Sequence, residues 1–185
     1  METIVLPEFK AFPKIPRFSR EVVITEKIDG SNALIHVNDR GDDLLAGSRS
    51  RWISPTSDNY GFAKWVQSNR EELLKLGPGT HFGEWWGNGI QRGYGMEKKK
   101  FSLFNVSKWE EDRPKCCDVV PVLWRGNMND VSKAIENCLF DLGINGSVAS
   151  PGFMRPEGIV IFHVAGGVLF KKTLEKDESP KGKES

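Results

Sequence analysis

The stretch Glu26-Lys27-Ile28-Asp29-Gly30-Ser31-Asn32 lies between two runs of apolar and β-branched residues, 22–25 and 33–37. Such runs are typical of strands, so this stretch is expected where one strand turns into the next. A lysine at a strand end, beside a glycine that lets a ligand approach the backbone, could act as a nucleophile. The alternative for Lys27 is an ordinary surface lysine in a hairpin turn, and the stretch alone does not decide between them.

Two further stretches have the apolar spacing of helices. Apolar residues within 62–76 form part of one helical face, which stops at Gly77-Pro78. The pattern in 131–142 is more regular, because apolar residues recur there at steps of three and four. Asp130 is the expected N-cap of this helix, and Gly143 is the expected residue after its end.

Strands are expected to dominate the rest of the fold. A strand is predicted after Gly79, and short apolar runs at 119–123 and 158–162 predict two more. The strands and helices do not alternate regularly, as they would in a chain of βαβ units. The predicted fold class is therefore α+β, with mainly antiparallel sheets and flanking helices.

The composition fits one ordinary globular domain. The 185 residues carry a formal net charge of +1, with 38% hydrophobic and 28% charged residues, which excludes a collagen-like, coiled-coil or fully disordered chain. The domain is predicted over 1–174, and the charged residues 175–185 are expected to form a mobile tail. Because no apolar run reaches about 18 residues and no signal peptide is visible, we expect no membrane contact and a cytoplasmic location.

The net charge and the cysteines argue against two further classes of protein. A nearly neutral chain does not coat nucleic acid through bulk positive charge, although basic stretches such as 10–20 and 92–100 leave room for a local RNA groove. The three cysteines, Cys116, Cys117 and Cys138, contain no CxxC pair, which argues against a disulfide framework or a zinc site.

Four more short stretches carry charged side chains in settings suited to phosphate chemistry. Ser48-Arg49-Ser50-Arg51 offers guanidinium groups, and Phe82-Gly83-Glu84 places a carboxylate among glycine and aromatic residues. Glu157 begins an apolar strand, and Phe170-Lys171-Lys172 ends another. Taken alone, each of these carboxylates and arginines could be a solvated surface group.

Taken in order, these motifs resemble those of the covalent nucleotidyltransferases, the superfamily of polynucleotide ligases and capping enzymes, and within it the RNA ligase 2-like family. The matches are motif I (26–32), Ia (48–51), III (82–84), IIIa (101–104), IV (157–160) and V (170–172). The resemblance implies a nucleotidyltransferase (adenylation-domain) core. Relatives usually add a C-terminal OB or helical domain that grips nucleic acid. Too few residues follow motif V for such a domain, so a partner protein could supply that clamp.

The resemblance implies an ATP-dependent RNA ligation in three steps. Lys27 would attack the α-phosphorus of ATP, expel pyrophosphate and form lysyl–AMP. AMP would then pass to an RNA 5′-phosphate, and a 3′-hydroxyl would displace it. Because a lysine with the ordinary pKa of about 10.4 is almost wholly protonated at pH 7, the amine needs desolvation or nearby positive charge. Lys171 and a bound Mg²⁺ or Mn²⁺ would supply that charge.

The resemblance also distributes roles among the residues. Lys27 and Lys171 are the implied catalytic residues. Glu84 would accept hydrogen bonds from the ribose hydroxyls, and Glu157 would hold the metal. Phe101 would stack on adenine, although its spacing alone favours core packing. The implied nucleotide-binding set is Glu26, Asn32, Arg49, Glu84, Phe101, Glu157 and Lys171, and the secondary candidates are Asp29, Arg51 and Lys172.

Motif V departs from the family pattern. The family commonly has Lys-x-Lys there, whereas this chain has Lys171-Lys172-Thr173, so the second lysine is either displaced onto the opposite face of the strand or replaced by Thr173. Three alternative functions stay open. A DNA nick ligase and a capping-type guanylyltransferase would share the lysine chemistry, and a nucleotide- or RNA-binding module would have lost turnover.

Overall fold

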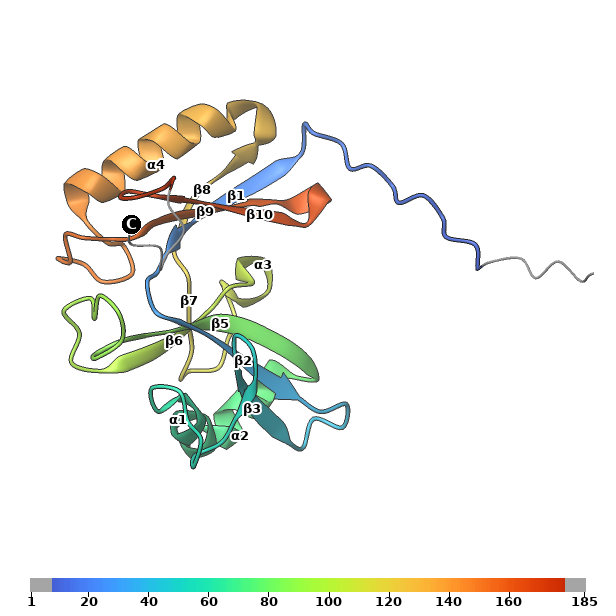
Figure 1. The fold of residues 1–185 in the computed structure, drawn as a ribbon, viewed down its shortest axis with the longest axis vertical. Coiled ribbons are helices and arrows are strands. Elements are labelled where there is room, and N and C mark those ends of the chain that lie inside the picture. Colours follow the sequence, from blue (N-terminus) through green and yellow to red (C-terminus); the bar gives the residue numbers. More distant parts are fainter. Residues whose placement is uncertain (1–7, 179–185) are drawn as a thin grey trace, which may run out of the picture.

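The computed structural model of the chain describes residues 8–178, which form two sheets that face each other (Figure 1). Sheet A has the order β10-β9-β1-β8 and consists of β1 (Glu21–Lys27), β8 (Val122–Asn127), β9 (Gly158–His163) and β10 (Val168–Thr173). Sheet B has the order β4-β3-β2-β5-β6-β7 and consists of β2 (Ser31–Val37), β3 (Leu44–Ser48), β4 (Trp52–Ile53), β5 (Gly79–Gly87), β6 (Lys99–Leu103) and β7 (Asp118–Val119). All strand pairs are antiparallel except β6 with β7, so the predicted fold class is confirmed.

Helices cover the outer faces of both sheets. The long helix α4 (Val131–Asn145) lies on sheet A, and α1 (Phe62–Ser68) and α2 (Arg70–Leu73) lie on sheet B (Figure 1). The remaining short elements are α3 (Val106–Trp109), η1 (Leu74–Leu76), η2 (Met128–Asp130) and η3 (Val164–Gly166).

Buried apolar side chains form three clusters that match these layers. One cluster packs α4 against sheet A and includes Ile24, and a second packs α1 and α2 against sheet B and includes Phe62. The third cluster lies between the sheets and includes Val23 and Trp86. The neighbours Val23 and Ile24 belong to different clusters because successive side chains of a strand point to opposite faces. Both faces of sheet A are therefore packed.

The turn predicted at motif I carries the chain from sheet A to sheet B. Strands β1 and β2 contain the predicted runs 22–25 and 33–37, and residues 28–30 join them. At Gly30 the backbone approaches β5 so closely that a Cβ atom would lie 2.6 Å from the carbonyl oxygen of Trp85. Only glycine allows that approach, which holds the end of β1 against sheet B.

The ends of α4 differ from the prediction. Asp130 occupies the N-cap position, but its side chain makes no capping hydrogen bond, because the turn η2 leads directly into the helix. Gly143 lies inside the helix, which ends before Gly146 with its φ of 79°. Gly146 suits the end of the helix better than Gly143, because its φ is positive and a Cβ there would lie 2.5 Å from the carbonyl oxygen of Phe153.

Two predicted elements are interrupted. The helix predicted over 62–76 is broken at Asn69, whose φ of −114° and ψ of 20° are not helical, and it continues as α2 and η1. The strand predicted over 119–123 is two strands in different sheets, since β7 ends at Val119 and β8 begins at Val122. Pro121 lies at that break and has no backbone N–H for a central ladder.

The structure describes only part of the predicted tail, residues 175–178. Residues 175–178 lie beside β10, where the Asp177 carboxylate accepts a hydrogen bond of 2.8 Å from the Thr173 backbone N–H. Residues 179–185 of that prediction lie outside the described residues. Across residues 8–178, no helix is long and apolar enough to cross a membrane.

Candidate active site

Lys27 is the last residue of β1 and lies against a glutamate from the start of β9. Its Nζ is 2.6 Å from Oε2 of Glu157. The register explains the contact, because Lys27 pairs with Gly158, the residue after Glu157. The Lys27 side chain is 22% exposed, whereas Glu157 is only 2% exposed. The amine is therefore held by a buried carboxylate and still has access from solvent.

Glu84 supplies a second buried carboxyl group beside this pair. On sheet B it lies opposite Asn32, and it accepts hydrogen bonds of 2.9 Å from the Gly30 N–H and 3.0 Å from Nδ2 of Asn32. Burial raises the pKa of the Glu84 carboxyl to about 7, although the positive charge of Lys27 and both hydrogen bonds act in the opposite direction. Motifs I, III and IV thus converge between the two sheets.

The raised pKa of Glu84 makes folding stability depend on pH. An unfolded glutamate ionises near 4.5, so between that pH and about 7 the unfolded chain loses this proton before the folded chain does. The contribution of Glu84 to stability therefore falls as the pH rises through this window. Glu84→Gln removes the cost of ionisation, and we expect it to stabilise the protein by about 1–3 kcal/mol near pH 8 and by much less near pH 4.5.

Urea unfolding of both proteins at the two pH values measures this difference. The control is Glu136→Gln, because Glu136 is exposed on α4 and its substitution changes the same charge. A gain in stability that is equal at both pH values would contradict the assignment of a raised pKa to Glu84.

Lys171 and Lys172 lie on opposite faces of β10, as predicted from the departure in motif V. Lys171 pairs with Val160, which pairs with Thr25, so Lys171 shares the face of sheet A on which Lys27 lies. Lys172 lies on the α4 side of the sheet, and its Nζ is 3.3 Å from a carboxylate oxygen of Asp177. Of the two lysines, only Lys171 lies on the face of sheet A that carries Lys27.

Glu26 precedes Lys27, and its side chain points to the opposite face of β1. Its buried carboxylate accepts hydrogen bonds from Ser147 Oγ at 2.6 Å and from the N–H groups of Val148 and Ala149 at 2.9 and 2.8 Å. Burial raises its pKa, and these hydrogen bonds partly oppose that change. Glu26 thus anchors the loop after α4, a placement that does not support its predicted contact with the nucleotide.

Phe101 lies in the core beneath sheet B. It is fully buried, and its ring centroid lies 5.1 Å from that of Phe62 and 5.9 Å from that of Trp65. Its ring therefore has no open face for a base, and the predicted adenine contact is corrected to core packing. The residue that sequence reasoning missed is Phe104, which is 41% exposed and lies two positions after Ser102, the partner of Glu84.

The two arginines of motif Ia occupy the exposed turn between β3 and β4. Arg51 binds the loop ahead of α1, since its Nη1 donates to the Ser57 carbonyl at 3.2 Å and to the Ser57 hydroxyl at 3.0 Å. Arg49 is exposed in the same turn. Within residues 8–178, neither arginine makes a hydrogen bond or ion pair with Lys27, so the predicted role of Arg49 stays a prediction.

Arg92 is a second residue that the sequence did not reveal. Its Nε lies 3.0 Å from Oδ2 of Asp29, and its Nη1 donates to the carbonyl oxygens of Arg155 at 3.0 Å and Pro156 at 3.4 Å. One guanidinium group thus ties the turn after Lys27 to the residues that precede Glu157. We regard Arg92 as a positioning residue for that pair.

The carboxylates suit a metal ion that is shared with a ligand. No cluster of three or more His, Cys, Asp or Glu side chains that could hold a metal occurs in the part of the chain that the structure describes. Glu157 and Glu84 nevertheless place two carboxyl groups beside Lys27, and their charges interact. Mg²⁺ often takes one or two carboxylates and completes its shell with water and phosphate oxygens, so these residues fit such an ion.

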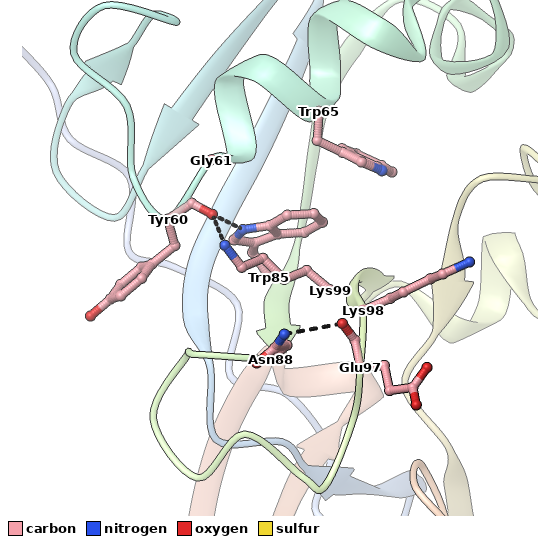
Figure 2. Close-up of a pocket in the computed structure, with 8 residues that line it drawn as sticks. All are labelled: Tyr60, Gly61, Trp65, Trp85, Asn88, Glu97, Lys98 and Lys99. Carbon is pink, nitrogen blue, oxygen red and sulfur yellow. Dashed lines mark hydrogen bonds between the residues drawn. The ribbon is translucent and has the colours of Figure 1, made fainter.

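A cavity of about 360 Å³ lies elsewhere, at the end of β5 on the α1 side of sheet B (Figure 2). Figure 2 shows Trp65 and Trp85 on its walls, with Lys98 and Lys99 at the edge. The Trp85 Nε1 and the Lys99 Nζ both donate to the carbonyl oxygen of Tyr60, at 3.2 and 2.8 Å. None of the predicted site residues lines this cavity.

Comparison with known proteins agrees with the convergence of these motifs. The sequence profile of the RNA ligase family matches residues 20–173. The chain belongs to the RNA ligase family. No match was found among curated proteins.

Solved structures of Naegleria gruberi RNA ligase have the same fold. A variant with ATP and manganese gives a TM-score of 0.65 at 20% identity, and the match covers 88% of this chain and 53% of that one. The structure with pyrophosphate gives 0.63 at 19% identity, covering 91% and 57%. The chain therefore spans just over half the length of those solved chains.

Proposed function

We propose that the chain is an ATP-dependent RNA ligase that carries AMP on Lys27 and joins an RNA 5′-phosphate to a 3′-hydroxyl. The observation that carries the proposal is the position of Lys27, 2.6 Å from the Glu157 carboxylate and within electrostatic reach of Glu84. Membership of the RNA ligase family supports it. So does the likeness to Naegleria gruberi structures with ATP or AMP and manganese.

In the first step a bond forms between Nζ of Lys27 and the α-phosphorus of ATP. The bond from that phosphorus to the bridging oxygen breaks, pyrophosphate leaves, and the amine loses its proton. Glu157 pairs with the charged ammonium in the structure, so release of that contact accompanies attack. Lys171, on the same face of sheet A, supplies positive charge to the phosphates.

The remaining site residues would hold the nucleotide and a divalent metal. Mg²⁺ or Mn²⁺ held by Glu157 would neutralise phosphate charge when bound. Glu84, fixed by Asn32 and the Gly30 N–H, would accept hydrogen bonds from the ribose hydroxyls. Phe104 takes the place of Phe101 as the aromatic residue available to the base, because it lies on the Glu84 side and is exposed.

Intact mass measurement of the purified protein tests the first step. After incubation with ATP and Mg²⁺ or Mn²⁺, we expect an increase equal to one AMP group, located on Lys27 by peptide analysis. An adduct formed from GTP and not from ATP would instead identify a capping-type guanylyltransferase. With 5′-phosphorylated RNA and nicked DNA offered separately, we expect joining of the RNA, and joining of DNA alone would favour a nick ligase.

A further inference from the structure

Residues 8–20 form an extended segment that leads into β1. In Figure 1 this segment, coloured dark blue, runs outward from the start of β1 and away from both sheets. Only its last residues are bound to the fold. His163 accepts the Gly166 N–H at Nδ1, so the neutral ring carries its proton on Nε2 and donates it to the Phe18 carbonyl 3.0 Å away. Ser19 also donates to Asn129 at 3.0 Å.

The segment has an apolar residue at every third position. These residues are highly exposed: Phe9 89%, Phe12 83%, Ile15 80% and Phe18 64%. A spacing of three places them along one edge of a polyproline II helix, a conformation that Pro13 and Pro16 favour. In the described part of the chain, residues 8–17 make no hydrogen bond or ion pair. Within residues 8–178, this apolar edge is therefore left largely uncovered.

The segment is also strongly basic. It contains Lys10, Lys14, Arg17 and Arg20, and its one acidic residue is Glu8. The whole chain has a net charge of only +1, so positive charge is concentrated here. Exposed aromatic rings interleaved with cations suit single-stranded nucleic acid, because bases stack on the rings and phosphates pair with the cations.

We propose that residues 8–20 bind the single-stranded RNA substrate, a proposal that rests on the RNA ligase function proposed above. The segment joins the fold at the opposite end of β1 from Lys27, a distance of about 20 Å for a seven-residue strand. The RNA that it holds therefore lies several nucleotides from the reacting end. RNA, and not a protein, is favoured because the charge of the segment complements phosphate.

Fluorescence anisotropy with a labelled single-stranded RNA, long enough to reach from Lys27 past the start of β1, tests this proposal. Two variants of the full chain separate the contributions. In the first, Lys10, Lys14, Arg17 and Arg20 are replaced by Gln; in the second, Phe9 and Phe12 are replaced by Ala. We expect each variant to bind at least about tenfold more weakly, and the first to lower the salt slope by about 0.7 per lost phosphate contact.

The matched control replaces four exposed cations elsewhere, Arg40, Lys64, Lys115 and Lys133, by Gln. It removes the same charge and should keep most of the affinity. Equal weakening by the control would mean that bulk charge is responsible and would overturn the proposal. Unchanged RNA affinity in the Phe9/Phe12 variant, with a changed mass in light scattering, would overturn it in favour of a protein interface.

Two further measurements separate this proposal from the proposed function. Lysyl–AMP formation without RNA should be the same in every variant, since the segment contacts no predicted site residue. Transfer of AMP to a 5′-phosphorylated dinucleotide should also be unaffected, because so short an RNA does not reach the segment. If Lys27 takes up AMP normally while the segment variants bind long RNA as well as the unmodified chain, the segment proposal fails and the ligase function stands.

Discussion

Lys27→Ala is expected to abolish the covalent uptake of AMP, with a loss of at least about a thousandfold. We expect no other lysine to replace it, because among residues 8–178 Lys27 is the lysine that lies against Glu157 and close to Glu84. The measurement is the intact mass after incubation with ATP and Mg²⁺ or Mn²⁺. Full AMP uptake by this variant would show that the nucleophile lies elsewhere.

Further measurements test whether the loss of AMP uptake results simply from misfolding. Lys27→Ala leaves the buried Glu157 carboxylate without the ammonium group, so its stability must be compared with that of the unmodified chain. Lys27→Arg keeps a positive charge there but has no primary amine, and we expect it to fold and still take up no AMP. Lys133→Ala, on the exposed side of α4, should retain full uptake.

The part of the fold that local patterns specify was predictable. The β-branched runs on either side of motif I form β1 and β2, and the apolar spacing at 131–142 forms α4. The contact between Lys27 and Glu157 was not predicted, because 130 residues separate them in the chain and the family resemblance gave Glu157 only a metal-holding role. Their contact depends on the register between β1 and β9, which no local pattern contains.

The predicted nucleotide contacts of Glu26 and Phe101, which the structure does not support, depend on which face of a strand each residue occupies. Glu26 and Lys27 are neighbours in a strand, where successive side chains point to opposite faces. The sequence alone therefore already places them on opposite sides of β1. The same reasoning separates Phe101 from Phe104, once Ser102 is known to pair with Glu84. For Phe101 the decisive quantity is burial beneath α1, and that depends on packing between distant segments.

Arg92 shows the limit of sequence reasoning most clearly. It lies in a glycine-rich loop between β5 and β6, and the sequence placed it only in the basic stretch 92–100, with no sign of a contact near Lys27. Its importance comes from reaching both Asp29, 63 residues earlier in the chain, and the carbonyl oxygens of Arg155 and Pro156, 63 and 64 residues later. Only the folded chain brings these groups together.

Glu157→Gln is expected to slow lysyl–AMP formation by about a hundredfold or more at saturating ATP. Two roles for Glu157 make opposite predictions. If it merely pairs with the Lys27 ammonium, loss of its charge would release the amine and speed the reaction at neutral pH. If it also holds the divalent metal, the reaction slows and the Mn²⁺ concentration needed for half-maximal rate rises.

The rate of AMP uptake over a range of Mn²⁺ concentrations therefore decides between the two roles. We expect the slower reaction with the greater demand for metal, because Glu157 is a buried carboxylate directly beside Lys27, and carboxylate oxygens are ligands that such metals prefer. Glu136→Gln is the control and should match the unmodified chain, since Glu136 lies exposed on α4. A Glu157→Gln variant that reacts faster than the unmodified chain at every Mn²⁺ concentration would remove Glu157 from the metal site and leave it as a charge partner of Lys27.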